Sequence, residues 1–150
     1  MIEGYMSVKI IKLRINGAPI AASRARITKR GAYLPKKYQQ GKEAVVAIIR
    51  AELAKQGITE PYHGPVSVSL TFIHSRPKRF PKGQTGRILK CTRPDIDNLA
   101  KTYLDASTEA GLWNDDNQVC SLILTDMYAD LNEEAHVQMS IRCFELGGRL

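Results

Sequence analysis

The chain has 150 residues, and its content of 43% hydrophobic and 25% charged residues is typical of one globular domain with a sizeable core. The net charge is +7, no apolar run is long enough to cross a membrane and no secretory signal is evident, so we expect a cytoplasmic protein that does not act in a membrane. The three cysteines are widely spaced, which excludes a full disulfide framework and a zinc site of the CxxC type.

The first half of the chain predicts one strand and one helix. Residues 8–15 are rich in β-branched residues and predict a strand, which ends at the turn signal Asn16-Gly17. Residues 18–37 are basic and irregular, which indicates a loop or a short hairpin. Residues 37–56 carry apolar side chains near one face of a helix, so a helix is expected there.

The second half of the chain predicts three strands and a second helix. We expect a strand over residues 66–74, a long basic loop over 75–92, a helix from near Asp97 to just before Gly111, and strands over 119–128 and 135–144. The last two strands are close in sequence and are predicted to pair as an antiparallel hairpin. This order predicts a single α+β domain with a small mixed sheet and two main helices.

Charge divides this domain into two parts. Residues 1–93 hold 19 of the 22 lysines and arginines and four acids, a net charge of +15. Residues 94–150 hold three basic residues and 11 acids, a net charge of −8. We therefore interpret the first part as facing a polyanion such as DNA and the second as a separate place for cations, although the lysines of the first part can also be simple solvated surface.

Several carboxylates and one lysine gather around the start of the second predicted helix. Asp95 and Asp97 are two residues apart and point to the same side of an extended lead-in, while Lys101 follows Asp97 by one helical turn. Asp115 and Asp116 come after the helix, and Asp116 is expected to join Asp95 and Asp97 if the next strand packs beside the helix start. Two or three carboxylates with open positions suit Mg²⁺, which would polarise a phosphoryl group.

These residues also allow plain structural roles. Asp97 is a suitable N-cap for the helix, a contribution of typically about 1 kcal/mol to stability. Lys101 is placed to form ordinary i,i+4 ion pairs with Asp97 or Asp105, each worth roughly 0.2–0.5 kcal/mol. Asp115 and Asp116 can lie in a solvated turn.

The strongest pattern is the combination of two segments. These are Arg93-Pro94-Asp95-Ile96-Asp97-Asn98-Leu99-Ala100-Lys101 and Gly111-Leu112-Trp113-Asn114-Asp115-Asp116-Asn117-Gln118-Val119, with Asp105-Ala106 between them. This combination resembles the RusA family of Holliday junction resolvases, also called crossover junction endodeoxyribonucleases, which includes many prophage members. The similarity is close over residues 93–119 and loose over most of the remaining chain. The loop at 75–92 is longer than in compact members, and the N-terminal basic segment matches weakly.

The resemblance implies a homodimeric, magnesium-dependent endonuclease that acts on four-way DNA junctions in recombination and repair, with Mn²⁺ as a substitute metal. It assigns the catalytic and metal-binding acids to Asp95, Asp97 and Asp116, an essential lysine to Lys101, and a neighbouring acid of uncertain role to Asp115. A C2 dimer would present two equivalent sites to the two equivalent strands of a junction.

The hypothesis is therefore a hydrolase that resolves junctions by paired symmetric cuts, with DNA contacts predicted from charge and loop placement at Arg24, Arg26, Lys29, Arg30, Arg76, Lys78 and Arg79. Two alternatives stay open. The chain can be a basic DNA-binding module without catalysis, or a metal nuclease that acts on flaps, forks or RNA.

Overall fold

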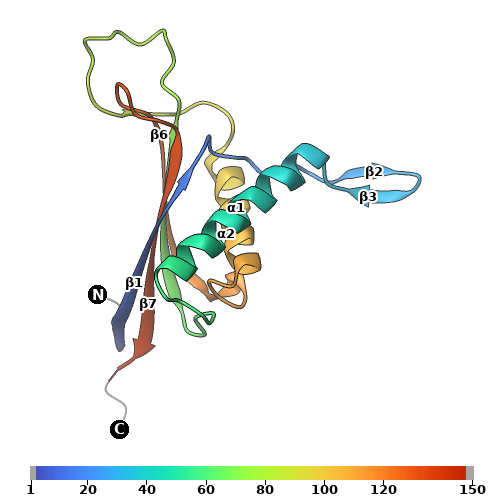
Figure 1. Cartoon of the computed structure of the whole chain (residues 1–150), viewed down its shortest axis with the longest axis vertical. Coiled ribbons are helices and arrows are strands. Elements are labelled where there is room, and N and C mark those ends of the chain that lie inside the picture. The colour runs from blue at the N-terminus through green and yellow to red at the C-terminus, as the bar shows by residue number, and fades with distance from the viewer. Residues whose placement is uncertain (1–2, 148–150) are drawn as a thin grey trace.

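The computed structural model describes residues 3–147, and these form one five-stranded mixed sheet with two helices packed on one of its faces (Figure 1). The main strands are β1 (Tyr5–Asn16), β4 (Val66–His74), β6 (Val119–Tyr128) and β7 (His136–Leu146), and the short β5 (Ile88–Leu89) completes the sheet. The helices are α1 (Lys36–Lys55) and α2 (Ile96–Ala110), and a short 3₁₀ helix, η1 (Asp116–Gln118), precedes β6. A separate hairpin is formed by β2 (Arg26–Thr28) and β3 (Gly31–Tyr33).

The predicted single α+β domain with a mixed sheet and two main helices is confirmed. The predicted bounds of β4 and β6 coincide with those observed, and α1 begins one residue earlier than predicted. The basic segment before α1 is a hairpin, which settles the choice between the two predicted forms. No helix within residues 3–147 has the length and apolar content that a membrane crossing needs.

The predicted hairpin between the last two strands is wrong. The sheet order is β1-β7-β4-β6-β5, so β4 lies between β6 and β7. β6 runs parallel to β4 because the two are connected through α2, which returns the chain to the same end of the sheet. β7 then fills the position between β1 and β4 and pairs antiparallel with both of them.

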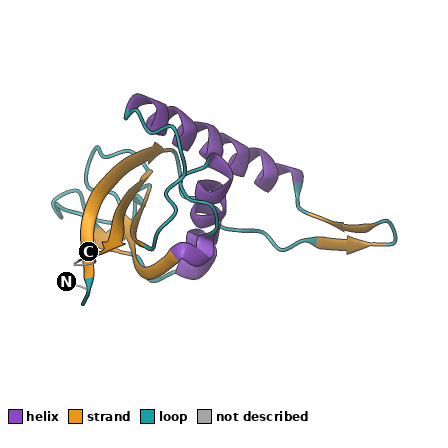
Figure 2. Ribbon diagram, turned by 90° about the horizontal axis from the view of Figure 1, so that it is seen from below, coloured by secondary structure: helices purple, strands orange, loops and turns teal. Residues whose placement is uncertain are grey.

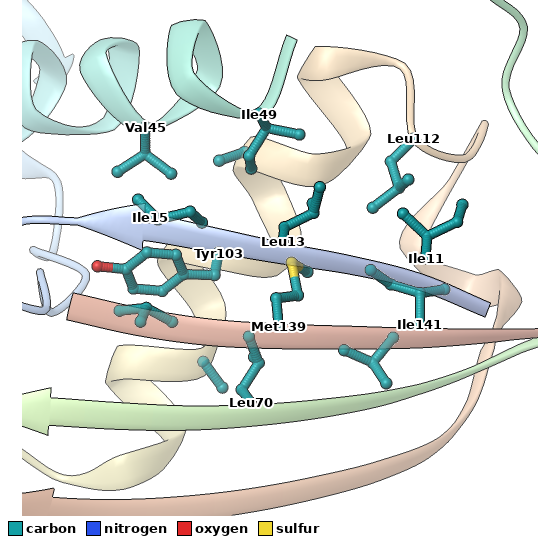
Figure 3. Packing of buried hydrophobic residues seen from close by; sticks show 14 of the residues in the cluster. Ile11, Leu13, Ile15, Val45, Ile49, Leu70, Tyr103, Leu112, Met139 and Ile141 are labelled. Carbon is teal, nitrogen blue, oxygen red and sulfur yellow. The ribbon is translucent and has the colours of Figure 1, made fainter. Parts of the chain in front are cut away.

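The core lies between the sheet and the two helices. Leu13 of β1, Met139 of β7 and Leu70 of β4 are aligned across neighbouring strands and face Ile49 of α1 and Tyr103 of α2 (Figure 3). All five side chains are buried, and each such side chain stabilises the fold by roughly 1.5–3 kcal/mol. The helices are thereby fixed on the sheet, and the start of α2 is held at one end of β6.

Candidate metal and DNA site

The start of α2 exposes the two acids of the first motif. α2 begins at Ile96, so Asp95 occupies the N-cap position, and the carbonyl of Asp95 accepts the first helical hydrogen bond from the Leu99 amide at 3.2 Å. The expectation that Asp97 caps the helix is therefore wrong, because the N-cap position lies two residues earlier, at Asp95. The Asp95 side chain makes no cap hydrogen bond, and Asp97 Oδ1 accepts only from the adjacent Asn98 amide at 3.0 Å. Both carboxylates are exposed and retain lone pairs for a cation.

The segment that leads into these acids is anchored by a buried cation. Lys90 Nζ donates hydrogen bonds to the carbonyl oxygens of Thr92 and Arg93 at 2.7 and 2.9 Å. The Lys90 side chain is 6% exposed, and its ammonium lies 3.7 Å from Asp126 Oδ2 of β6. Asp126 is in turn 2.6 Å from His74 Nε2, at the end of β4. The sheet thus fixes the backbone immediately before Pro94 and Asp95, and the Arg93–Pro94 peptide bond is cis.

This anchored segment and β6 form the walls of a groove. The groove has a volume of about 690 Å³, and its lining includes Asp95 and Asp97 on one side and Leu124, Thr125 and Asp126 of β6 on the other. A phosphate group is much smaller than this volume, so the groove has room for a nucleotide segment beside the two exposed carboxylates.

Lys101 stands one helical turn after Asp97. Its side chain is exposed, whereas the preceding Leu99 and Ala100 are buried in the core. Lys101 is therefore on the solvent face of α2, as the i,i+4 spacing predicts, and its ammonium is available to a bound phosphate.

The second motif folds into the cap of η1. Asp115 Oδ1 accepts a hydrogen bond from the Asn117 amide at 2.9 Å, and Gln118 Oε1 accepts from the Asp115 amide at 3.1 Å, which completes a capping box. Gln118 also donates to the carbonyls of Tyr62 and Gly64. Asp115 therefore has a structural role in holding this turn.

Asp116 is exposed and chemically distinct from Asp115. Partial burial raises the pKa of the Asp116 carboxyl, and hydrogen bonding to Asp115 and the negative charges of Asp115 and Asp105 raise it further. A carboxylate surrounded by other acids is stabilised in its charged form by a cation. Asp116 is thus a suitable cation ligand.

One chain does not bring Asp116 into the group formed by Asp95 and Asp97. Asp116 lies near Asp105, and Asp105 follows Asp97 by eight residues, about 12 Å along the axis of α2. In Figure 1 the start of α2 and the orange segment that follows the helix lie at opposite ends of α2. Within residues 3–147, no three His, Cys, Asp or Glu side chains are grouped closely enough to hold a metal ion. The two exposed carboxylates of Asp95 and Asp97 fit a hard cation such as Mg²⁺, but they supply only part of a ligand set.

The predicted DNA contacts fall into two groups. Arg24, Arg26, Lys29 and Arg30 are exposed on the hairpin segment, and Lys78 and Arg79 are exposed in the loop between β4 and β5. Arg76 is different, because its guanidinium donates to the carbonyls of Gly86 and Ala129 at 3.0 and 3.1 Å and also to Gln84. Arg76 therefore holds the loop closed, and we leave it out of the DNA surface.

The hairpin segment begins beside the acids. The Ala22 amide donates to the carbonyl of Asn98, in the first turn of α2, at 2.9 Å, and the Ile20 amide donates to the Tyr103 hydroxyl at 3.0 Å. On the return side, the hydroxyls of Tyr38 and Thr102 are 3.4 Å apart. The cationic hairpin segment therefore starts next to the negatively charged Asp97.

Lys90, Asp126 and His74 were missed by the sequence reasoning. Lys90 was one of many cations in a basic loop, and Asp126 is a single acid within a strand. The available signal was an ionisable residue near the end of a largely apolar strand, since such a residue is rarely buried without a partner.

Comparison with known proteins gives two findings. The sequence model of the family described as "Endodeoxyribonuclease RusA" matches residues 16–142 of this chain. The chain is also 29% identical over 143 residues to the uncharacterized protein YqaN of Bacillus subtilis (strain 168), and this similarity covers 88% of the chain and 95% of that protein. The matched region includes both acid motifs, the anchored segment and the hairpin.

Proposed function

Because the chain belongs to the RusA family of endodeoxyribonucleases, we propose that it is a magnesium-dependent, structure-specific nuclease that resolves four-way DNA junctions by paired symmetric cuts in recombination and repair. The observation that carries this proposal is the pair of exposed carboxylates at Asp95 and Asp97, neither of which caps the helix it stands on. Lys101, one helical turn later, and the cationic hairpin segment at the same helix start supply positive charge that can bind a phosphodiester beside the two carboxylates.

Each residue has a distinct task in this proposal. Asp95 and Asp97 hold the metal, which when bound supplies Lewis-acid activation of the phosphoryl group and of an attacking water. Lys101 contacts the scissile phosphate and stabilises the negative charge that develops during cleavage. Lys90 acts through the backbone, because it fixes the carbonyls of Thr92 and Arg93 ahead of Asp95.

We further propose that two copies of the chain complete each metal site. The resemblance assigns three acids to each site, whereas Asp116 of the same chain lies along α2 near Asp105, away from Asp95 and Asp97. In a C2 dimer, Asp116 of a second copy can face the Asp95 and Asp97 of the first, and the reverse holds at the other site. Two sites related by a twofold axis match the two equivalent strands of a four-way junction.

The test is cleavage of a synthetic four-way junction with a mobile core, with and without Mg²⁺, beside linear duplex, a flap and an RNA duplex. We expect symmetric nicks in the junction alone, only with Mg²⁺, and none with Asp97→Asn, which should still fold and bind the junction. Glu109→Gln is the matched control, because Glu109 is an exposed acid near the other end of α2 that pairs with Lys42. Binding without any cleavage would instead support a non-catalytic DNA module, and preferred cleavage of flaps or RNA would support a different nuclease.

A further inference from the structure

The hairpin segment of residues 23–34, which we call the arm, projects away from the domain (Figure 2). Its two short strands pair only with each other, and every residue from Ser23 to Tyr33 is exposed. None of these residues belongs to the hydrophobic core. A two-stranded hairpin without a packing surface is marginally stable in water, so the arm has the features of an element that gains its stability from a partner.

The charge of the arm identifies the class of partner. The arm and the start of α1 carry six cations and no acid between residues 22 and 37, and these cations are Arg24, Arg26, Lys29, Arg30, Lys36 and Lys37. Such a segment is complementary to a polyanion, and a two-stranded ribbon is narrow enough to fit a DNA groove.

One residue of the arm does not fit phosphate binding. Ile27 is 87% exposed, the largest exposure among the large hydrophobic side chains that the structure describes. Its cross-strand partner is Ala32, whereas Arg26 and Tyr33 pair on the opposite face of the ribbon. Because the Ala32 methyl group is small, Ile27 projects alone from its face. An isolated apolar side chain among cations is the arrangement that DNA-bending proteins use when they insert a wedge between base steps.

The root of the arm lies beside the proposed cleavage site. The backbone of Ala22 is hydrogen bonded to Asn98, which follows Asp97 directly. DNA that lies on Asp95 and Asp97 therefore passes the root of the arm. The centre of a four-way junction is where base pairs are most easily unstacked, since stacking is already interrupted there.

We propose that the arm enters the branch point of a DNA junction, with Ile27 inserted between unstacked base pairs and the flanking cations on the phosphates. This inference rests on the proposed function and adds the element that distinguishes branched DNA from linear duplex. Arg26, Lys29 and Arg30 bind every DNA through its backbone, and Ile27 selects the branched form.

The experiment uses four-way junctions with 2-aminopurine at the branch point, whose fluorescence rises when the base is unstacked, in buffer without divalent cations. We expect wild type to raise the fluorescence and Ile27→Ala to abolish the rise. We also expect this variant to lose roughly tenfold in preference for junction over duplex, with an unchanged salt dependence, because no charge is removed. Ile10→Ala is the matched control, since Ile10 is 48% exposed on β1, outside the arm.

A charge variant separates the two roles within the arm. Lys29→Ala combined with Arg30→Ala should weaken junction and duplex binding equally and lower the slope of log affinity against log salt by about two. If Ile27→Ala kept the wild-type fluorescence rise and the wild-type preference for junction over duplex, the proposed insertion of Ile27 would be overturned. A change in the sedimentation mass of that variant would also overturn it, because it would assign Ile27 to an interface between copies of the chain. A wild type that neither prefers nor cuts junctions would instead refute the proposed function itself.

Discussion

The two ends of α2 present acids in opposite ways. At its start, Asp95 and Asp97 expose their carboxylates, of which only that of Asp97 accepts a hydrogen bond, and the backbone before them is fixed by the Lys90 side chain. Beyond its end, Asp115 uses its carboxylate to cap η1, and Asp116 stands next to it with a raised pKa. The comparison teaches that adjacent acids in a motif can serve different purposes, and that a single chain keeps Asp116 apart from Asp95 and Asp97.

The largest effect is expected from mixing two inactive variants. Asp97→Asn and Asp116→Asn should each abolish cleavage. If each site combines acids of two copies, a mixed dimer has one doubly altered site and one intact site. Equal mixing with subunit exchange should then restore nicking to about a quarter of the wild-type rate, since half of the dimers are mixed and each has one intact site.

The measurement is a single-turnover nicking assay on a junction with labelled strands. Remixed wild-type protein serves as the control for the exchange procedure. A mixture as inactive as its two components would place all three acids of each site in one chain and would remove the two-copy proposal.

A smaller but still large effect is expected at the anchor before Asp95. Lys90→Met removes the ammonium that holds two carbonyls and leaves Asp126 with His74 alone. We expect a loss of about 2 kcal/mol in the free energy of unfolding, because two hydrogen bonds from a charged group are lost. Half-maximal cleavage should require at least several-fold more Mg²⁺, as measured by titration.

Lys82→Met is the matched control for this anchor. Lys82 is exposed in the same loop, and the same substitution there should leave stability and the Mg²⁺ requirement unchanged. An unchanged Mg²⁺ requirement in Lys90→Met, at a temperature where the variant is folded, would show that Lys90 stabilises the domain without positioning Asp95.

The helices and strands of this fold could be predicted from the sequence more accurately than the pairing of the strands in the sheet. The alternation of apolar residues marked β4 along its full length, and the bounds predicted for β6 also coincide with those observed. Their parallel pairing through α2 was available from the strand–helix–strand order, but the short link before β7 favoured a hairpin that does not form. The position of β7 depends on contacts with β1, more than a hundred residues away in the chain, and no local pattern contains that information.

The candidate site shows a similar division. Asp95, Asp97 and Lys101 are exposed around the start of α2, as predicted, although Asp97 lies in the first turn of the helix and not in an extended segment before it. Residue spacing could not predict where Asp116 lies relative to Asp95 and Asp97, because that position depends on the length of α2 and on the η1 turn. The place of Asp126 within a strand was a signal of burial, but its partners could not be identified, since only the packed sheet brings Lys90 and His74 to it.

At the other end of α2, Asp115→Ala should lower the free energy of unfolding by about 1 kcal/mol, because the cap of η1 is lost. Asp115→Ser should restore most of that stability, since serine also accepts a hydrogen bond in this position. Asp116→Asn should have the opposite profile, with cleavage abolished and stability maintained or raised, because a neutral side chain removes repulsion from Asp115 and Asp105. Urea unfolding and junction cleavage of the three variants would test this division, and loss of cleavage in Asp115→Ser would contradict a purely structural Asp115.

The smallest effect is expected at the base of the loop that leads to Asp95. Arg87 forms a bidentate ion pair with Glu133, with its closest contact at 2.7 Å, and this pairing holds the pKa of Glu133 at about 2. Because the folded pKa lies below the unfolded value of 4.5, the pair contributes stability above pH 4.5 and loses it as the pH falls toward 2. Glu133→Gln should therefore cost about 1 kcal/mol at pH 7 and progressively less below pH 4.5, as measured by urea unfolding at each pH. Glu134→Gln is the control, since Glu134 is exposed. If Glu133→Gln lowered the free energy of unfolding equally at pH 7 and pH 3, packing of the side chain, rather than its charge, would be what stabilises the loop.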